Sequence, residues 1–331
     1  MLRLSLLILP LFILACANSK TASPSTTDTR PNMLVILLDD MGYSDMGCYG
    51  SEIATPNMDY LAEQGQRFSQ YCTAPMCAPT RAMLLSGNDN HIEGMGRMMS
   101  VRGNHRNYLG RPHYEEDISE RVVLFPKLLQ KAGYYTSMSG KWHLGWDDSS
   151  DPYLHGFDDT WALRNSFANY YDSRNYGISD IKLRDTISMY TNNGKSVKYP
   201  VGQHATEVYT EKAITYFNTA KSLQKPFFTY LAYTAPHWPL QVEEKYCEPY
   251  LGQYDDGFRA VMQRRLKGLK EKGIITADTP LPAYPDVPKW DSLTESARKL
   301  LARKMELQAG LIAHLDEHIG KVIQSLKDNG Q

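Results

Sequence analysis

The sequence is short of three features that would each point to a particular kind of protein. Lysine plus arginine (36) almost equals aspartate plus glutamate (37), so no sizeable net charge gathers a polyanion and we expect no nucleic-acid partner. The five cysteines match neither a zinc-ligand spacing nor a dense disulfide framework, and leave open one bridge among Cys48, Cys72 and Cys247. No internal repeat is present. The 331 residues, 42% of them hydrophobic, have the composition of a globular protein with a sizeable core.

Long apolar runs are also scarce, and the most continuous one lies at the start of the chain. Residues 4–14 are almost entirely apolar and follow a positively charged start. This run is shorter than the ~20 residues that a membrane-spanning helix requires. It is typical of an export signal, which we expect over residues 1–16. Residues 17–30 are polar, have little to bury and predict a flexible tether.

Cys16 is a candidate site for a lipid that would anchor an exported chain to a membrane. It follows Ile-Leu-Ala in a segment that resembles a bacterial lipobox, in which the cysteine is lipidated and becomes the mature N-terminus. Cleavage of an ordinary signal near Ala15 or Ala17 is the alternative, because small residues stand at both positions. We therefore expect an exported bacterial protein that is either periplasmic or anchored to the outer membrane through a lipid on Cys16.

Strand and helix patterns alternate from residue 31 onward. Apolar runs predict strands at residues 33–38 and 226–232, and a weak alternation predicts one at 66–71. A further strand is expected at residues 134–139, after a helix that ends at Gly133. The first of these strands reads as buried on both faces. Helical spacing predicts helices at residues 56–64, 79–86, 122–132, 207–220 and 298–327, the last as one helix or two. We expect residues 145–200 to be irregular. The order predicts a single α/β domain over residues 31–331, with a largely parallel central sheet flanked by helices.

Polar side chains follow three of these strands. Asp39 and Asp40 come directly after the strand at 33–38, Lys141 and His143 follow the strand at 134–139, and His237 follows the strand at 226–232. Ligands of parallel sheets collect at the carboxyl ends of the strands, so we expect these side chains to meet at one edge. Each also has a plainer interpretation: a solvated turn, a surface lysine, a satisfied histidine, or a rigid loop.

The residue types at this edge suit the chemistry of an anion. Two adjacent carboxylates, Asp39 and Asp40, repel each other unless a cation such as a hard divalent metal offsets their charge. If residues 141–143 are extended, Lys141 and His143 lie on one face, where a cation neutralises charge and an imidazole transfers a proton.

The segment 77–81 reads Cys-Ala-Pro-Thr-Arg. Pro79 is expected near the first helical position, which places Cys77 at a helix N-terminus. That end carries partial positive charge and free N–H groups suited to an anion, and Arg81 lies one turn further on. A buried structural cysteine beside a surface arginine is the alternative.

Taken together, these motifs resemble those of the type I (formylglycine-dependent) sulfatases, in particular the bacterial arylsulfatase branch. The Cys-x-Pro-x-Arg segment that begins at Cys77, followed by Leu-Leu-Ser-Gly, is similar to the modification signal of that family. The Asp-Asp pair, the Gly-Lys-Trp-His-Leu-Gly segment of residues 140–145 and the Pro-His-x-Pro loop of residues 236–239 follow the order of the family. The resemblance implies an alkaline-phosphatase/sulfatase-like fold.

The resemblance also implies a nucleophile and a metal. Cys77 would be oxidised to formylglycine by a formylglycine-generating or anaerobic sulfatase-maturing enzyme, and the hydrated aldehyde would attack a sulfate ester. Asp39 and Asp40, with the modified Cys77, would bind one calcium ion that polarises the sulfate oxygens.

Four further residues take roles from the resemblance. Arg81 and Lys141 would hold and acidify the aldehyde diol. His143 would assist release of sulfate from the diol. His237 would contact the sulfate and help to protonate the leaving oxygen, whether of an aryl, glycan or steroid sulfate.

One part of the family's pattern is not found. The resemblance implies a second metal-ligand pair after a downstream strand, a further lysine and a smaller C-terminal domain. Asp328 and Asn329 do not supply that pair, because they lie at a predicted helix end with no strand before them. We therefore expect a chain truncated on its C-terminal side, with an incomplete sheet and little turnover. A phosphonate or phosphate monoester hydrolase, or a catalytically inactive tethered fragment that binds sulfate or glycan, remain as alternatives.

Overall fold

The computed structural model describes residues 28–98, 111–145, 148–172 and 190–331. The predicted export signal with its Cys16 anchor, and most of the tether, lie outside the described residues. Within the described part of the chain, no helix combines the length and the apolar character that crossing a bilayer demands. The cysteines described there are all free, so the bridge left open by the sequence is not formed.

A mixed sheet of six strands forms the centre, in the order β1-β6-β2-β3-β4-β5. The strands are β1 (Met33–Asp39), β2 (Tyr135–Lys141), β3 (Asp159–Leu163), β4 (Tyr190–Asn192), β5 (Lys195–Val197) and β6 (Phe227–Pro236). β1, β6, β2 and β3 run parallel, and β4 and β5 are added antiparallel. The predicted α/β fold with a largely parallel sheet is confirmed.

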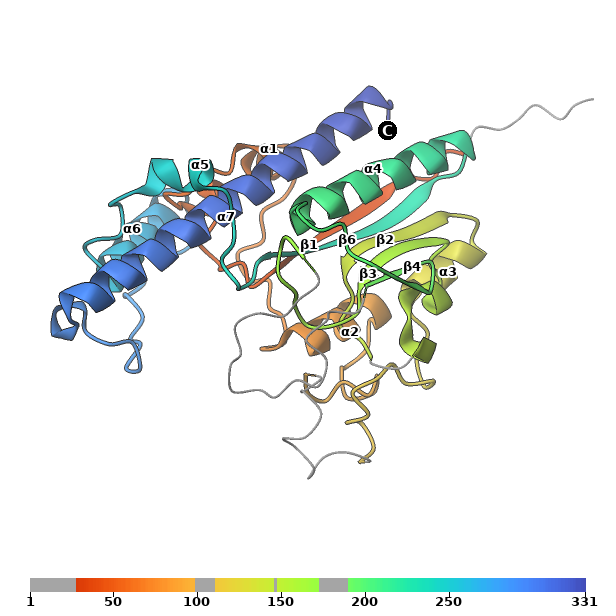
Figure 1. The fold of residues 1–331 in the computed structure, drawn as a ribbon, viewed down its shortest axis with the longest axis horizontal. Coiled ribbons are helices and arrows are strands. Elements are labelled where there is room, and N and C mark those ends of the chain that lie inside the picture. Colours follow the sequence, from red (N-terminus) through yellow and green to blue (C-terminus); the bar gives the residue numbers. More distant parts are fainter. Residues whose placement is uncertain (1–27, 99–110, 146–147, 173–189) are drawn as a thin grey trace, which may run out of the picture.

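Helices cover both faces of this sheet. They are α1 (Pro56–Gln64), α2 (Cys77–Ser86), α3 (Phe125–Lys131), α4 (Ala205–Ser222), α5 (Glu244–Cys247), α6 (Phe258–Glu271) and α7 (Glu295–Asp328). Figure 1 shows α4 and α7 on one side of the sheet and α2 and α3 on the other. α7 is one continuous helix, and its N-cap Thr294 accepts a hydrogen bond from the Ala297 N–H.

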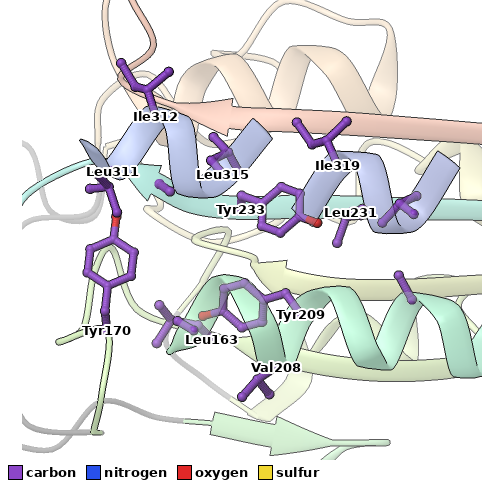
Figure 2. Packing of buried hydrophobic residues seen from close by; sticks show 14 of the residues in the cluster. Leu163, Tyr170, Val208, Tyr209, Leu231, Tyr233, Leu311, Ile312, Leu315 and Ile319 are labelled. Atoms are coloured by element: carbon purple, nitrogen blue, oxygen red, sulfur yellow. The ribbon is translucent and has the colours of Figure 1, made fainter. Parts of the chain in front are cut away.

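β6 shows how an interior strand contributes side chains to the cores on both faces of the sheet. Leu231 and Tyr233 belong to the core that includes Leu315 and Ile319 of α7 (Figure 2), whereas Tyr230 belongs to the core on the α2 side. Because successive side chains point to opposite faces, a strand between two helix layers buries both of its faces, and the two threonines of β6, Thr229 and Thr234, are buried with its apolar residues. Each fully buried leucine contributes roughly 2 kcal/mol to this packing.

Three expectations about local structure were wrong. No strand forms at residues 66–71; there the carbonyls of Phe68 and Ser69 accept hydrogen bonds from tyrosine hydroxyls instead of from a neighbouring strand. Residues 33–38 are only half-buried, because β1 is one of the two edge strands of the described sheet. Residues 145–200 contain β3, β4 and β5, and Asn193-Gly194, with φ of 50° and 74°, forms the turn between β4 and β5.

Candidate active site

The ends of β1, β2 and β6 bring three predicted site residues to one edge. Asp39 is the last residue of β1 and pairs in register with Pro236 of β6, directly before His237, while Lys141 ends β2. The close approach of β2 to β6 requires glycine at position 140, since a Cβ there would lie 1.9 Å from the carbonyl oxygen of Ala232. The convergence predicted from the strand ends is therefore present.

Asp39 holds two cations at the centre of the site. Its Oδ2 lies 2.6 Å from Nζ of Lys141 and its Oδ1 lies 3.2 Å from a guanidinium nitrogen of Arg81. All three side chains are buried. Burial opposes ionisation of Asp39, but Lys141 and Arg81 outweigh it and hold the pKa of the carboxyl below its ordinary value. Two cations and one anion leave this buried group with a net positive charge, which suits an anionic ligand.

Arg81 is oriented by more than its ion pair. Its Nη1 donates to the backbone carbonyl of Lys141 at 2.7 Å and to the hydroxyl of Tyr230 at 3.3 Å. Its Nε is buried and has no hydrogen-bond partner. A buried donor without a partner is costly, so it marks a position where an anion would be stabilised.

Cys77 and His143 form the next contact. Cys77 is the first residue of α2, as predicted, and its Sγ lies 3.2 Å from Nδ1 of His143. Burial, followed by the charges of Lys141 and Arg81, lowers the pKa of His143 well below its ordinary value. His143 is thus a neutral imidazole, with Nδ1 facing the thiol and Nε2 buried without a partner.

The backbone between Lys141 and His143 differs from the expectation. His143 has a φ of 59°, so the segment is not extended there. Trp142 nevertheless points away from the site into the core, where its Nε1 donates to the carbonyl of Ser150. Lys141 therefore reaches the site from the end of β2, and His143 reaches it through its left-handed backbone conformation rather than from an extended segment.

His237 and Asp40 lie on the exposed side of the edge. Nε2 of His237 is 3.6 Å from Oδ2 of Asp40, whose side chain is 61% exposed. The His237 ring stacks on Phe167 at 6.0 Å, and the hydroxyl of Tyr170 donates to the His237 carbonyl at 2.8 Å. Sequence reasoning missed Phe167 and Tyr170 because both stand in the stretch interpreted as irregular.

Asp39 and Asp40 are the candidate metal ligands of this edge. Their carboxylate oxygens are the donors that hard divalent cations prefer, so the residue types fit such an ion. Asp40 is open to solvent, with Nε2 of His237 3.6 Å from its Oδ2, whereas both oxygens of Asp39 face cations. Two carboxylates supply part of the six to eight oxygens that calcium takes.

Comparison with known proteins identifies the family. Residues 31–331 match the family described as Sulfatase, so the chain belongs to the sulfatase family. It is 39% identical over 308 residues to an uncharacterized sulfatase of Schizosaccharomyces pombe, covering 91% of this chain and 55% of that protein. It is 38% identical over 302 residues to the arylsulfatase of Klebsiella aerogenes, covering 91% of this chain and 63% of that protein.

Solved structures are also similar. Ps i-CgsB, solved in complex with k-i-k-neocarrahexaose, has a TM-score of 0.64 and 26% identity, over 91% of this chain and 56% of that one. The chain thus spans between 55% and 63% of the length of the relatives named above. The family resemblance and the sulfatase-like fold predicted from the sequence are confirmed. Members of this family generally use a formylglycine residue and a divalent metal.

Proposed function

We propose that the protein hydrolyses a sulfate ester at the edge formed by β1, β2, β6 and α2. The observation that carries this proposal is the buried, net positive group of Asp39, Arg81 and Lys141 beside the N-terminus of α2, where Cys77 stands. Cations fixed in a buried site stabilise the negative charge that develops on sulfate oxygens without having to reorganise during the reaction.

Cys77 is proposed as the precursor of the nucleophile, and its Sγ stands where the hydroxyls of a hydrated formylglycine would be. Such a residue supplies one hydroxyl that attacks sulfur and a second that expels sulfate as the aldehyde re-forms. Arg81 and Lys141 hold these hydroxyls in a positive field. Nδ1 of His143, 3.2 Å from Sγ and neutral, takes up the proton when sulfate leaves.

Asp39 and Asp40, together with position 77, would hold one divalent ion, for which calcium fits the oxygen donors. Such an ion polarises the sulfate oxygens. His237 stands beside Asp40 and its Nδ1 contacts the carbonyl of Trp238 at 2.5 Å, so its Nε2 is the atom that exchanges a proton with the leaving oxygen.

The aromatic surroundings of His237 favour an aryl sulfate as substrate. Phe167 and Trp238 pack at 4.6 Å beside the histidine, and Trp238 is 44% exposed. An exposed aromatic face binds a planar ring by stacking. The similarity to the Klebsiella aerogenes arylsulfatase supports the same class of substrate. Maturation by a formylglycine-forming enzyme, export to the periplasm and a lipid anchor at Cys16 are part of this proposal.

The test combines mass analysis with a comparison of two esters. After export from a host that contains a sulfatase-maturing enzyme, the peptide with residue 77 should carry the aldehyde, and an aryl sulfate should be hydrolysed faster than an aryl phosphate. Cys77→Ala should reduce turnover at least ~1000-fold, because the nucleophile is lost. Cys72→Ala, which removes an exposed thiol, is the matched control.

Three results would contradict the proposal. An unaltered thiol at position 77 in active protein removes the nucleophile. Faster hydrolysis of the aryl phosphate assigns the protein to phosphate or phosphonate esters. If the unsubstituted protein shows no turnover, and Cys77→Ala leaves its affinity for sulfate or glycan unchanged, the protein is a binding module.

A further inference from the structure

A second group of ligand-type side chains lies on the opposite face of the sheet, between α4 and α7. His314 and His318 are four residues apart on α7 and therefore share one side of that helix. Glu207 comes from the first turn of α4. One ligand atom from each of these three side chains lies within 4.8 Å of the others. The proposed sulfate chemistry uses none of them.

His314 has the least satisfied ring of the group. Its side chain is 4% exposed, and its Nε2 lies 3.7 Å from Oε1 of Glu207. Its Nδ1 is buried and has no hydrogen-bond partner among the residues that the structure describes. A buried ring nitrogen without a partner costs free energy that an ion would recover. The distance to Glu207 is longer than a hydrogen bond, so the two groups approach each other without being bonded.

His318 is oriented as histidine ligands commonly are. Its Nδ1 lies 2.9 Å from the backbone carbonyl of His314 and donates to it, which leaves the lone pair on Nε2. That Nε2 is 3.1 Å from Nζ of Lys321. Lys321 is half-exposed and also pairs with Glu317 at 3.0 Å. Its ammonium can therefore stay with Glu317 and give up its place at His318 when an ion binds.

The surrounding residues keep the two imidazoles neutral. The ring of His204 lies 4.3 Å from that of His314, and the ring of Tyr246 lies 4.8 Å from it. Burial, then the neighbouring histidines His204 and His318, lowers the pKa of His314 to about 2. Lys321 and Lys245 add positive charge, while Glu207 with Glu317 and Glu243 add negative charge around the cluster. Neutral imidazole is the form that binds a metal.

We propose that Glu207, His314 and His318 bind a divalent transition-metal ion of the zinc type, which joins α4 to α7. Two imidazoles and one carboxylate are donors that such ions prefer, unlike the oxygen donors at the sheet edge. Three protein ligands leave a fourth position for water. The ion would stabilise the packing of the two helices over β6, and it is distinct from the ion proposed for Asp39 and Asp40.

The experiment uses cobalt(II) as a spectroscopic probe. Purified full-length protein is treated with a chelator and titrated with Co²⁺, and separately with Zn²⁺. We expect one equivalent of Co²⁺ to give the strong visible absorption of a tetrahedral site, Zn²⁺ to displace it, and Zn²⁺ to raise Tm. His318→Gln should lower the Co²⁺ affinity at least ~100-fold, since even the loss of an outer partner costs 10–100-fold.

Three variants test whether the cobalt band comes from this cluster. Asp40→Asn removes a ligand of the sheet edge and should leave the cobalt band unchanged. His91→Gln removes an exposed histidine elsewhere and should do the same. Lys321→Ala removes the competing ammonium and should tighten Co²⁺ binding, which a purely packing role for the cluster would not produce.

The proposal is overturned if the cobalt band is absent, or if it persists unchanged in His318→Gln. Far-UV circular dichroism of the metal-free variant establishes that a lost band reflects a lost ligand rather than an unfolded chain. Should His318→Gln fail this check, Glu207→Gln, from a half-exposed side chain, serves as the second ligand variant and must show the same weakening.

Discussion

His143 at the sheet edge and His314 on α7 make an instructive pair. Both are buried, each has one ring nitrogen without a partner, and burial pulls the pKa of both down. Their neighbours differ. His143 lies among Arg81 and Lys141, whereas Nε2 of His314 lies 3.7 Å from a carboxylate oxygen of Glu207. Besides burial, positive charge lowers the pKa of both rings, so the two sites are distinguished by what converges on each histidine: two cations and a thiol at His143, a carboxylate and a second imidazole at His314.

The largest effect is expected from removing a cation next to His143, which tests whether the positive charge at the sheet edge is needed there and not at His314. Lys141→Met leaves Asp39 paired with Arg81 but removes the charge-assisted hydrogen bond to its Oδ2, so we expect the free energy of unfolding to fall by about 2 kcal/mol. Turnover should fall at least ~100-fold, because a fixed positive charge is lost. Urea unfolding and initial rates measure the two effects. Lys267→Met, at a 78% exposed position, is the control, and Co²⁺ binding should be unchanged in both variants.

Glu93 extends the comparison to a buried carboxyl that pairs with no cation among the described residues. Neither of its oxygens has a well-formed hydrogen bond, and burial, which outweighs a weak interaction with Ser86, raises its pKa to about 8. Between pH 4.5 and 8 the folded state keeps a proton that the unfolded state has lost, so stability should fall as pH rises.

Glu93→Gln should remove this fall, which is on the order of a few kcal/mol at about 1.4 kcal/mol per pKa unit. Unfolding by urea at several pH values between 5 and 8 measures it. Glu295→Gln, on an exposed helix start, should leave the pH dependence as it is. A parallel pH profile for Glu93→Gln and the unsubstituted protein would show that Glu93 ionises normally.

The smallest expected effect concerns Phe167 and Trp238, the aromatic side chains beside His237. Trp238→Ala removes the ring that packs on Phe167 beside His237. Stacking of this kind is worth about 0.5–1.5 kcal/mol, so KM for an aryl sulfate should rise roughly 2- to 10-fold with kcat nearly unchanged. Tyr284→Ala, an exposed aromatic elsewhere, is the control. An unchanged KM would contradict stacking of an aryl leaving group on these side chains.

Local sequence was sufficient for the scaffold and for the convergence of polar side chains at one edge of the sheet. Apolar runs located β1 and β6, and the predicted helix end at Gly133 located the start of β2. The polar residues at the ends of these strands had to meet because parallel strands end at the same edge. Pro79 placed Cys77 at the start of α2. The turn residues Asn193-Gly194 carried a readable hairpin signal, although residues 145–200 were expected to be irregular.

Packing decided the rest. Contacts between segments far apart in the chain pair Asp39 with both Arg81 and Lys141, and bring Glu207 to His314. The left-handed backbone of His143 was likewise not predicted from the sequence. A side chain's type and spacing are local properties, but its partners, its burial and therefore its charge state depend on which elements the folded core brings against it.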